Sequence, residues 1–136
     1  MSDTATVKAE SKEAIELRTG LAQHYGTQGY TRFSPLCPKM VLTDGALYLA
    51  EKAGAYWLMD IIGSYQKQCQ SDEMLREMQF WTLKVKDGEG VVTCERDSND
   101  IAITQEIPFT DFPLDEIKLY VCESGENMVV MLPSEY

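Results

Sequence analysis

Histidine and closely spaced cysteines are scarce in this 136-residue chain. Its only histidine is His24, and its cysteines include no Cys-x-x-Cys pair. The four cysteines are Cys37, Cys69, Cys94 and Cys122. A structural zinc site takes four ligands, usually in closely spaced pairs, and a small disulfide-stabilised domain carries cysteine at high density. The sequence therefore predicts no metal site, no cofactor and no disulfide framework, and we expect reduced, mostly buried thiols.

Long apolar runs and phosphate-binding glycine patterns are also missing. The longest apolar stretch, residues 54–63, is interrupted by Asp60 and is shorter than the ~20 residues that a membrane-spanning helix requires. Neither the P-loop nor the dinucleotide-binding glycine pattern occurs. Residues 1–10 have neither the basic start nor the apolar core of a signal peptide. We expect a cytoplasmic protein without membrane contacts, in which residues 1–10 are a flexible segment.

Basic side chains are nearly absent from the last part of the chain. Residues 87–136 hold twelve acidic side chains and only two basic ones, Arg96 and Lys118, whereas residues 1–86 hold ten of each. The net charge of −10 therefore belongs to the C-terminal part. A negative field of this kind attracts basic surfaces and repels nucleic acid and anionic lipid. The predicted partner is a basic protein surface, with no direct binding to nucleic acid or membrane.

Helical spacing dominates the N-terminal part. Apolar side chains recur every three or four positions over residues 11–25, which predicts a first helix. Residues 26–42 contain two glycines and two prolines between aromatic side chains, and this composition predicts an ordered loop. Thr43 is a suitable N-cap for a second helical region that keeps its spacing to Cys69, with a kink or break at Gly54.

From Met78 onward the apolar pattern alternates with a period of two residues, which is typical of strands. The first expected strand begins at Met78. The other four cover residues 91–95, 101–107, 117–121 and 128–132, with turn residues between them. Short connections favour antiparallel neighbours, so these strands predict a meander of four to five strands. Helices followed by strands indicate one α+β domain over residues 11–136, with the helices on one sheet face and the acidic side chains on the other face and its rims.

An aromatic ligand pocket is one candidate site. Tyr56, Trp57 and Trp81 are suited to stack a flat ligand such as a nucleotide, and Asp60 lies among apolar neighbours where a carboxylate suits acid–base catalysis. Aromatic side chains at helical spacing also fill cores, and Asp60 shares a helix face with Ser64. The favoured interpretation of these residues is therefore packing.

The segment of residues 110–116 is the second candidate. It places Asp111, Asp115 and Glu116 around two apolar side chains, Phe112 and Leu114. Two interpretations remain open. Either the segment is a recognition loop whose apolar tip inserts into a basic partner, or Phe112 and Leu114 close the end of the sheet.

Four stretches carry a resemblance: TDGALYLAE at residues 43–51, GAYWLMDII at 54–62, TDFPLDEI at 110–117 and MLPSEY at 131–136. Together they resemble a family of small uncharacterised bacterial domains that also occur in phages and other mobile elements. The resemblance extends over roughly residues 17–136. That family has no established activity, so the resemblance implies no catalytic residue. It implies a mobile-element setting, in which small acidic proteins often bind host machinery.

The leading functional hypothesis is a non-enzymatic, acidic interaction protein that binds the basic, nucleic-acid-binding surface of a host defence protein, as an inhibitor that mimics DNA. The alternative is a small-molecule or nucleotide-binding domain that uses the aromatic pocket. An enzyme with paired carboxylates from Asp44, Asp60, Asp115 or Glu116 is a third hypothesis. A deep aromatic cavity would favour the second hypothesis, and two carboxylates converging in a cleft would favour the third.

Overall fold

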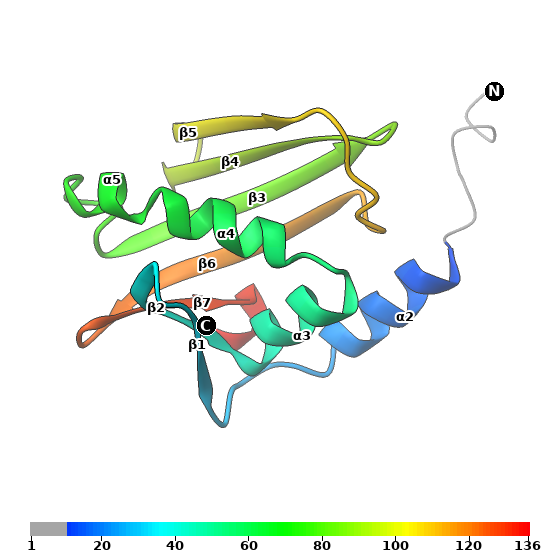
Figure 1. The fold of residues 1–136 in the computed structure, drawn as a ribbon, viewed down its shortest axis with the longest axis horizontal. Helices are drawn as coiled ribbons and strands as arrows, with labels where there is room; N and C mark the ends of the chain where they lie inside the picture. The colour runs from blue at the N-terminus through cyan, green and yellow to red at the C-terminus, as the bar shows by residue number, and fades with distance from the viewer. Residues whose placement is uncertain (1–10) are drawn as a thin grey trace.

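Helices and sheet form two layers in the computed structural model, which describes residues 11–136 (Figure 1). Residues 1–10, for which we predict flexibility, lie outside the described residues. The described helices are α2 (Lys12–Leu21), α3 (Asp44–Lys52), α4 (Tyr56–Ser64) and α5 (Gln66–Gln70). Helices α3, α4 and α5 cover one face of the sheet, and α2 packs beside α3. The predicted α+β class is confirmed.

Within residues 11–136 the strands form a seven-stranded sheet in the order β1-β2-β7-β6-β3-β4-β5. Their bounds are β1 (Tyr30–Ser34), β2 (Cys37–Thr43), β3 (Met78–Lys86), β4 (Glu89–Asp97), β5 (Asp100–Ile107), β6 (Glu116–Ser124) and β7 (Asn127–Met131). Strands β2 and β7 are parallel, and the other neighbours are antiparallel. The prediction of an antiparallel meander of four to five strands is therefore wrong in strand number and in order.

The predicted loop over residues 26–42 contains the hairpin of β1 and β2. Its prolines indicated a loop because proline cannot donate a ladder hydrogen bond. Pro35 lies in the turn, and Pro38 lies where the pairing of β1 with β2 shifts register and before the part of β2 that pairs with β7. Proline is tolerated at such positions. The consecutive apolar residues Met40, Val41 and Leu42 were the strand signal that the prolines concealed, because a strand buried on both faces has a continuous apolar run.

The meander fails because β6 does not pair with β5. The connection from β5 passes the end of the β3–β4 hairpin, where the Thr110 amide donates to the Gly88 carbonyl, and β6 then pairs with β3. Strand β7 continues to the far side and pairs with β2, so the N-terminal hairpin and the C-terminal strand join in one sheet. Pairings between segments so distant in sequence leave no signal in local spacing.

The helices are shorter than predicted. The first ends at Leu21, so its apolar stripe is Ala14, Leu17 and Leu21, and Tyr25 lies exposed beyond it. The second region is divided into α3, α4 and α5. The predicted break at Gly54 is confirmed, and its φ of 61° is a conformation that favours glycine. The predicted N-cap is also confirmed, because the Thr43 hydroxyl accepts a hydrogen bond from the Ala46 amide.

The core lies between the helices and the inward face of the sheet. Buried side chains of the strands include Met40, Leu42, Trp81, Leu83, Val92, Cys94, Ile103, Leu119, Val121 and Val130. Leu49, Leu58, Met59 and Ile62 of the helices pack against them. Leu58 and Trp81 are each 2% exposed, whereas Ile61 is only half-buried at the edge of this core.

A polar network crosses this apolar layer. Gln79 is fully buried on the inward face of β3, where the alternation of the strand predicts an apolar side chain. Its amide exchanges two hydrogen bonds of 2.9 Å with the amide of Gln66 at the start of α5. The Gln79 oxygen also accepts from the Trp81 indole at 2.8 Å. The network satisfies its buried polar groups and fixes α5 against β3.

The C-terminus is bound to the start of α3. The carboxylate of Glu135, in the short helix η1 (Pro133–Glu135), accepts from the Thr43 hydroxyl at 2.6 Å and from the Gly45 amide at 2.9 Å. It also accepts from the Leu132 amide at 2.9 Å. A carboxylate at a helix N-terminus is stabilised by the unpaired amides and by the helix dipole. We call these contacts the Glu135 clamp.

Leu58 and Ile61 test the boundary of the core. We expect Leu58→Ala to lower the free energy of unfolding by ~2–5 kcal/mol, because its side chain is buried between helix and sheet. Ile61→Ala should cost about 1 kcal/mol, since Ile61 is partly exposed. Urea unfolding of both variants measures the difference. Equal losses would show that the two positions are packed alike and would contradict this boundary.

Gly45 tests the Glu135 clamp. A Cβ atom at Gly45 would lie 2.5 Å from Glu135 Oε1 and 2.6 Å from Leu132 Cδ1, so Gly45→Ala must displace the carboxylate. We expect a loss of about 2 kcal/mol, the usual cost of losing hydrogen bonds to a charged group. Gly29→Ala is the control, because a Cβ there meets no atom within 4 Å. Similar unfolding midpoints for the two variants would contradict a stabilising clamp.

Candidate functional site

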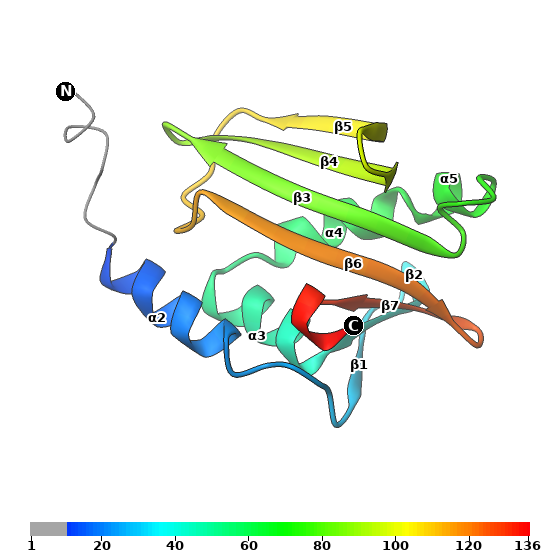
Figure 2. The same ribbon diagram turned by 180° about the vertical axis from the view of Figure 1, so that it is seen from behind.

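The sheet face opposite the helices is open over four strands. Figure 2 shows this side, where η1, among the described helices, lies over β7 and β6. Strand pairing sets the outward side chains in rows across the sheet: Met131–Tyr120–Phe80–Glu95–Ile101, Lys118–Thr82–Thr93–Thr104 and Glu116–Lys84–Val91–Glu106. We call the outward side chains of β6, β3, β4 and β5 the open sheet face. It is a flat surface of mixed charge on a rigid support.

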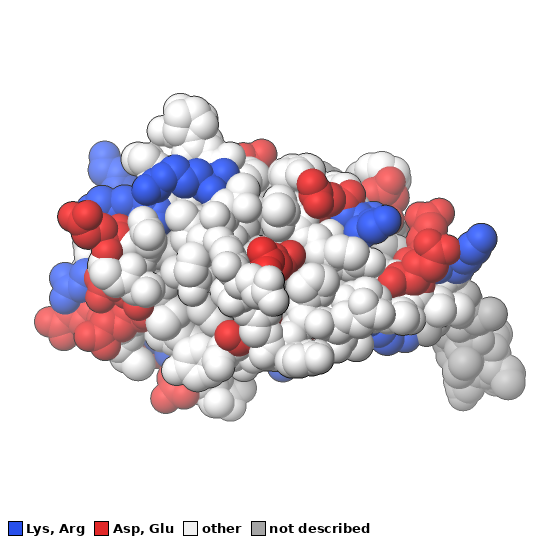
Figure 3. Space-filling view, turned by 90° about the horizontal axis from the view of Figure 1, so that it is seen from below, with Lys and Arg blue, Asp and Glu red and all other residues white. Residues whose placement is uncertain are grey.

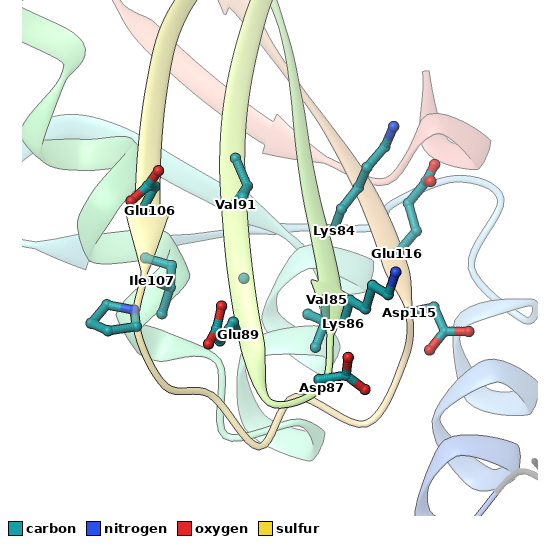
Figure 4. Close-up of a pocket in the computed structure, with 12 residues that line it drawn as sticks. Lys84, Val85, Lys86, Asp87, Glu89, Val91, Glu106, Ile107, Asp115 and Glu116 are labelled. Carbon is teal, nitrogen blue, oxygen red and sulfur yellow. The ribbon is translucent and has the colours of Figure 1, made fainter. Parts of the chain in front are cut away.

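A depression of about 1040 Å³ lies where these strands meet the β3–β4 turn, and we call this part of the molecule the hairpin end (Figure 4). Side chains from the ends of all four strands surround it. Its charged residues are Lys84, Lys86, Asp87, Glu89, Glu106, Asp115 and Glu116. Five carboxylates and two ammonium groups give this lining a net charge of −3. Val91, Ile107 and Pro108 supply apolar surface between the charges.

The acidic residues of the C-terminal part gather at the two ends of the sheet. Six lie at the hairpin end: Asp87, Glu89, Glu106, Asp111, Asp115 and Glu116. Five lie at the opposite end: Glu95, Asp97, Asp100, Glu123 and Glu126. The remaining acid, Glu135, is in the clamp. Figure 3 shows the molecule from below, where charged groups of both signs lie toward the two ends and a few acidic groups lie between them.

Intramolecular partners neutralise both basic residues of this part. The Arg96 guanidinium donates to Asp72 at 2.7 Å and to Asp100 at 3.1 Å, and the hydrogen bond from Arg96 lowers the pKa of Asp72. The Lys118 ammonium lies 3.9 Å from a Glu116 oxygen. The prediction that the acids occupy the outward face therefore holds for the rims, whereas the open sheet face itself carries Lys84, Lys86 and Lys118 among its acids.

The predicted recognition loop does not have the predicted apolar tip. Phe112 and Leu114 are 5% and 6% exposed and belong to the main core, so they close the end of the sheet. Asp111, Asp115 and Glu116 are exposed around them. The exposed aromatic side chain of this loop is Phe109, which is 79% exposed. Residue spacing could not distinguish Phe109 from Phe112, because both lie within two residues of Thr110 in the same short segment.

Phe109 belongs to a loop that is attached to the β3–β4 hairpin at both ends. The neighbouring Thr110 is buried, its amide donates to the Gly88 carbonyl at 2.8 Å, and its hydroxyl accepts from the Phe112 amide at 3.2 Å. The Val85 amide donates to the Asp115 carbonyl at the other end of the same loop. These bonds attach the loop to the β3–β4 hairpin at both ends. The backbone that carries Phe109 is therefore fixed next to Pro108, which lines the depression.

The four residues of the predicted aromatic pocket do not come together. Trp81 is buried in the core, with its ring 6.0 Å from that of Tyr65. Tyr56 is 44% exposed at the start of α4 and stacks on Phe33, with ring centroids 6.3 Å apart. Asp60 is exposed on the outside of α4, and Trp57 is half-buried. The interpretation of these side chains as packing residues is supported. The prediction of a ligand pocket formed by Tyr56, Trp57, Asp60 and Trp81 is wrong.

A smaller depression of about 230 Å³ lies on the open sheet face. Phe80 and Tyr120 form its aromatic side, with their rings edge to face at 5.2 Å. Lys118, Glu95 and Asp97 supply charges of both signs around it. Its size suits a single side chain of a partner rather than a nucleotide, because small-molecule sites usually enclose ~300 Å³ or more.

The cysteines have the character of packing residues. Burial raises the pKa of the Cys69 thiol to about 11 and that of Cys94 to about 12, and it also raises the pKa of Cys37. A thiol must ionise to act as a nucleophile or metal ligand, so these groups are inert near neutral pH. Over residues 11–136, no cluster of three or more histidine, cysteine or acidic side chains has the geometry to hold a metal ion. Nor does any helix in that range have the length and apolarity to cross a membrane.

Comparison with known proteins places the chain in a family. Residues 15–136 match a family described as "Family of unknown function (DUF6876)". No curated protein and no solved structure matches the chain. The matched range begins in α2 and includes every strand, the open sheet face and the Glu135 clamp. The chain belongs to this family of unknown function.

Proposed function

We propose that the protein is a non-enzymatic interaction module that binds a basic protein surface at the hairpin end. The observation that carries this proposal is the depression in which five carboxylates and two ammonium groups surround apolar side chains. One of its lining residues, Pro108, directly precedes the exposed Phe109 in the chain. Charges on strand ends are held in place by the sheet, so little entropy is lost when a partner binds.

The charge pattern supports a basic partner with a defined spacing of its cations. The carboxylates of Glu89, Glu106 and Asp115 attract lysine and arginine side chains over several ångströms and increase the rate of association. Lys84 and Lys86 stand between them and repel a partner whose cations are placed differently. A site of mixed sign thereby selects among basic surfaces, which a uniformly acidic face would not do.

Phe109 supplies the apolar part of the proposed contact. Binding energy in protein interfaces is concentrated in a few aromatic or aliphatic anchors, surrounded by polar groups that exclude water. Phe109 is the most exposed phenylalanine of the described chain and lies within the acidic loop of residues 108–115. Val91 extends the apolar surface on the neighbouring strand. A partner residue that packs on these side chains would be held by carboxylates on either side.

The proposed partner is a protein whose basic surface ordinarily binds nucleic acid. The resemblance to domains of phages and mobile elements supplies the setting, in which an acidic protein blocks a host defence protein by occupying that surface. Six acids at the hairpin end offer a short array of negative charge in place of phosphates. Mimicry of this type requires only a local cluster of negative charge, because long-range electrostatic attraction brings an acidic protein to a basic cleft before their shapes make contact.

Charge reversal at the two ends of the sheet tests the position of the site. We expect the triple variant Glu89→Lys, Glu106→Lys, Asp115→Lys to slow association with an oligolysine peptide by about tenfold at low ionic strength. The control variant Glu77→Lys, Glu123→Lys, Glu126→Lys changes the net charge equally, but at the opposite end, and should retain most of the rate. Stopped-flow fluorescence at about 0.05 and 0.5 M salt makes the comparison, and the difference should shrink as salt screens the charges. Equal slowing by both variants would show that the hairpin end is not a specific binding site and that the acidic residues serve only solubility.

Phe109 tests the apolar contact separately. Phe109→Ser should weaken binding of an oligolysine peptide with central leucines by about tenfold, through faster dissociation, because an anchor residue usually contributes more than 1 kcal/mol. The salt dependence should stay unchanged. Tyr25→Ser is the control, since Tyr25 is as exposed as Phe109 but lies after α2. If both variants bind like the wild type, Phe109 is not part of the contact surface.

A further inference from the structure

Strand β5 is an open edge of the sheet. It ends the strand order and, among residues 11–136, pairs only with β4. Its eight residues contain no proline, and the chain leaves it directly toward Phe109 and the hairpin-end depression. An edge strand of this length presents a row of backbone N–H and C=O groups that can pair with a further strand.

The other edge, β1, is much less suited to pairing. It has five residues, and its register shifts between Arg32 and Ser34. Pro35 follows it at once, and the Arg32 guanidinium donates to the Pro38 carbonyl across the hairpin. Short length, a bulge and nearby proline are the features by which proteins protect edges from pairing. The two edges therefore differ, and β5 is the one left able to accept a strand.

The charges of β5 decide which strand would fit. Its charged residues, Asp100 and Glu106, are both acidic and exposed, and Asp100 accepts a hydrogen bond from Arg96 at 3.1 Å. A second copy of the chain that paired with β5 in antiparallel fashion would bring Asp100 of one copy close to Glu106 of the other, and like charges across strands are destabilising. A basic strand meets the opposite situation, because each of its cations gains a carboxylate neighbour.

We infer that the basic partner segment binds as an added strand along β5, and this inference rests on the proposed function. The added strand would extend the row Glu116–Lys84–Val91–Glu106 with a basic side chain beside Glu106. On the other face it would continue the layer formed by Ile103 and Ile107, where an apolar side chain gains contact. The occupant is therefore an extended segment in which basic and apolar residues alternate.

Strand addition also brings one segment to the part of the hairpin end that lies nearest β5. A strand beside β5 runs parallel to the open sheet face, and its end reaches the loop of residues 108–115 that carries Phe109. Main-chain hydrogen bonds would supply affinity that does not depend on sequence, and alternate side chains would supply specificity. The depression at Glu89 and Glu106 then receives the cations of the segment rather than a separate ligand.

Selective N-methylation of a peptide tests this geometry. The probe is a peptide of alternating lysine and valine long enough to cover β5, compared with one isomer N-methylated at every lysine and another at every valine. In a strand, residues of one set direct their amides to one edge and residues of the other set to the opposite edge. We expect one isomer to lose binding by at least about tenfold and the other to stay within about threefold of the parent, because only one edge meets β5.

Two results separate this inference from the function on which it rests. If both methylated isomers bind as well as the parent peptide, attachment is by charge alone; strand addition is then overturned while the basic-surface function stands. If the parent peptide itself fails to bind, both are overturned. Hydrogen exchange gives an independent measurement: the parent peptide should slow exchange of amides in β5, and unchanged exchange there with saturating peptide would overturn strand addition. Glu106→Lys should weaken the parent peptide, and Glu123→Lys is the matched control.

Discussion

The parallel pairing of β2 with β7 is the contact on which the rest of the structure depends. It joins residues 40–42 to residues 128–130, and the Glu135 clamp immediately beyond it fixes the C-terminus to the start of α3. Without this pairing the N-terminal hairpin and the long antiparallel strands would be separate sheets. Because the pairing and the clamp lie next to each other, each reduces the conformational freedom that the other must restrict.

This arrangement leaves one sheet face covered and half of the other exposed. Helices α3, α4 and α5 bury the inward side chains, and η1 protects a small apolar cluster of Val41, Val129 and Met131 on the outward side. The strands farther from the clamp have no such cover over the described residues. Their ends carry most of the acidic side chains, because the turns and strand ends of antiparallel pairs lie together at two edges of the sheet. The acidic residues that are concentrated in the C-terminal part of the sequence therefore lie at the two ends of the sheet.

Local patterns allowed part of this structure to be predicted. The N-cap at Thr43, the break at Gly54 and the strands from Met78 onward follow from capping, glycine conformation and two-residue alternation, all of which act within a few residues. The strand partners could not be predicted, because β2 meets β7 through packing between segments at opposite ends of the chain. Gln79 illustrates the same limit, since its burial depends on a partner amide in α5.

Two residues of the predicted acidic segment, Asp115 and Glu116, line the depression, whereas Phe112 and Leu114 of the same segment do not. The acidic segment of residues 110–116 does lie at one end of the sheet, yet its apolar side chains Phe112 and Leu114 are core. An apolar residue in a short loop has no periodicity to show which way it points, so exposure was decided by the hydrogen bonds of Thr110 and not by sequence spacing. Three of the four stretches that carry the family resemblance lie in the clamp and in helices α3 and α4, and the fourth is the acidic segment at the hairpin end.

Acidic residues on an exposed edge have two physical effects at once. Asp100 and Glu106 oppose pairing of β5 with another copy of itself, which an uncharged strand of this length would invite. The same carboxylates lower the energy of pairing with a basic strand, so protection from aggregation and selection of a partner arise from one charge pattern. The net charge of −10 is then best understood through its placement at the edge and ends of the sheet rather than through its total.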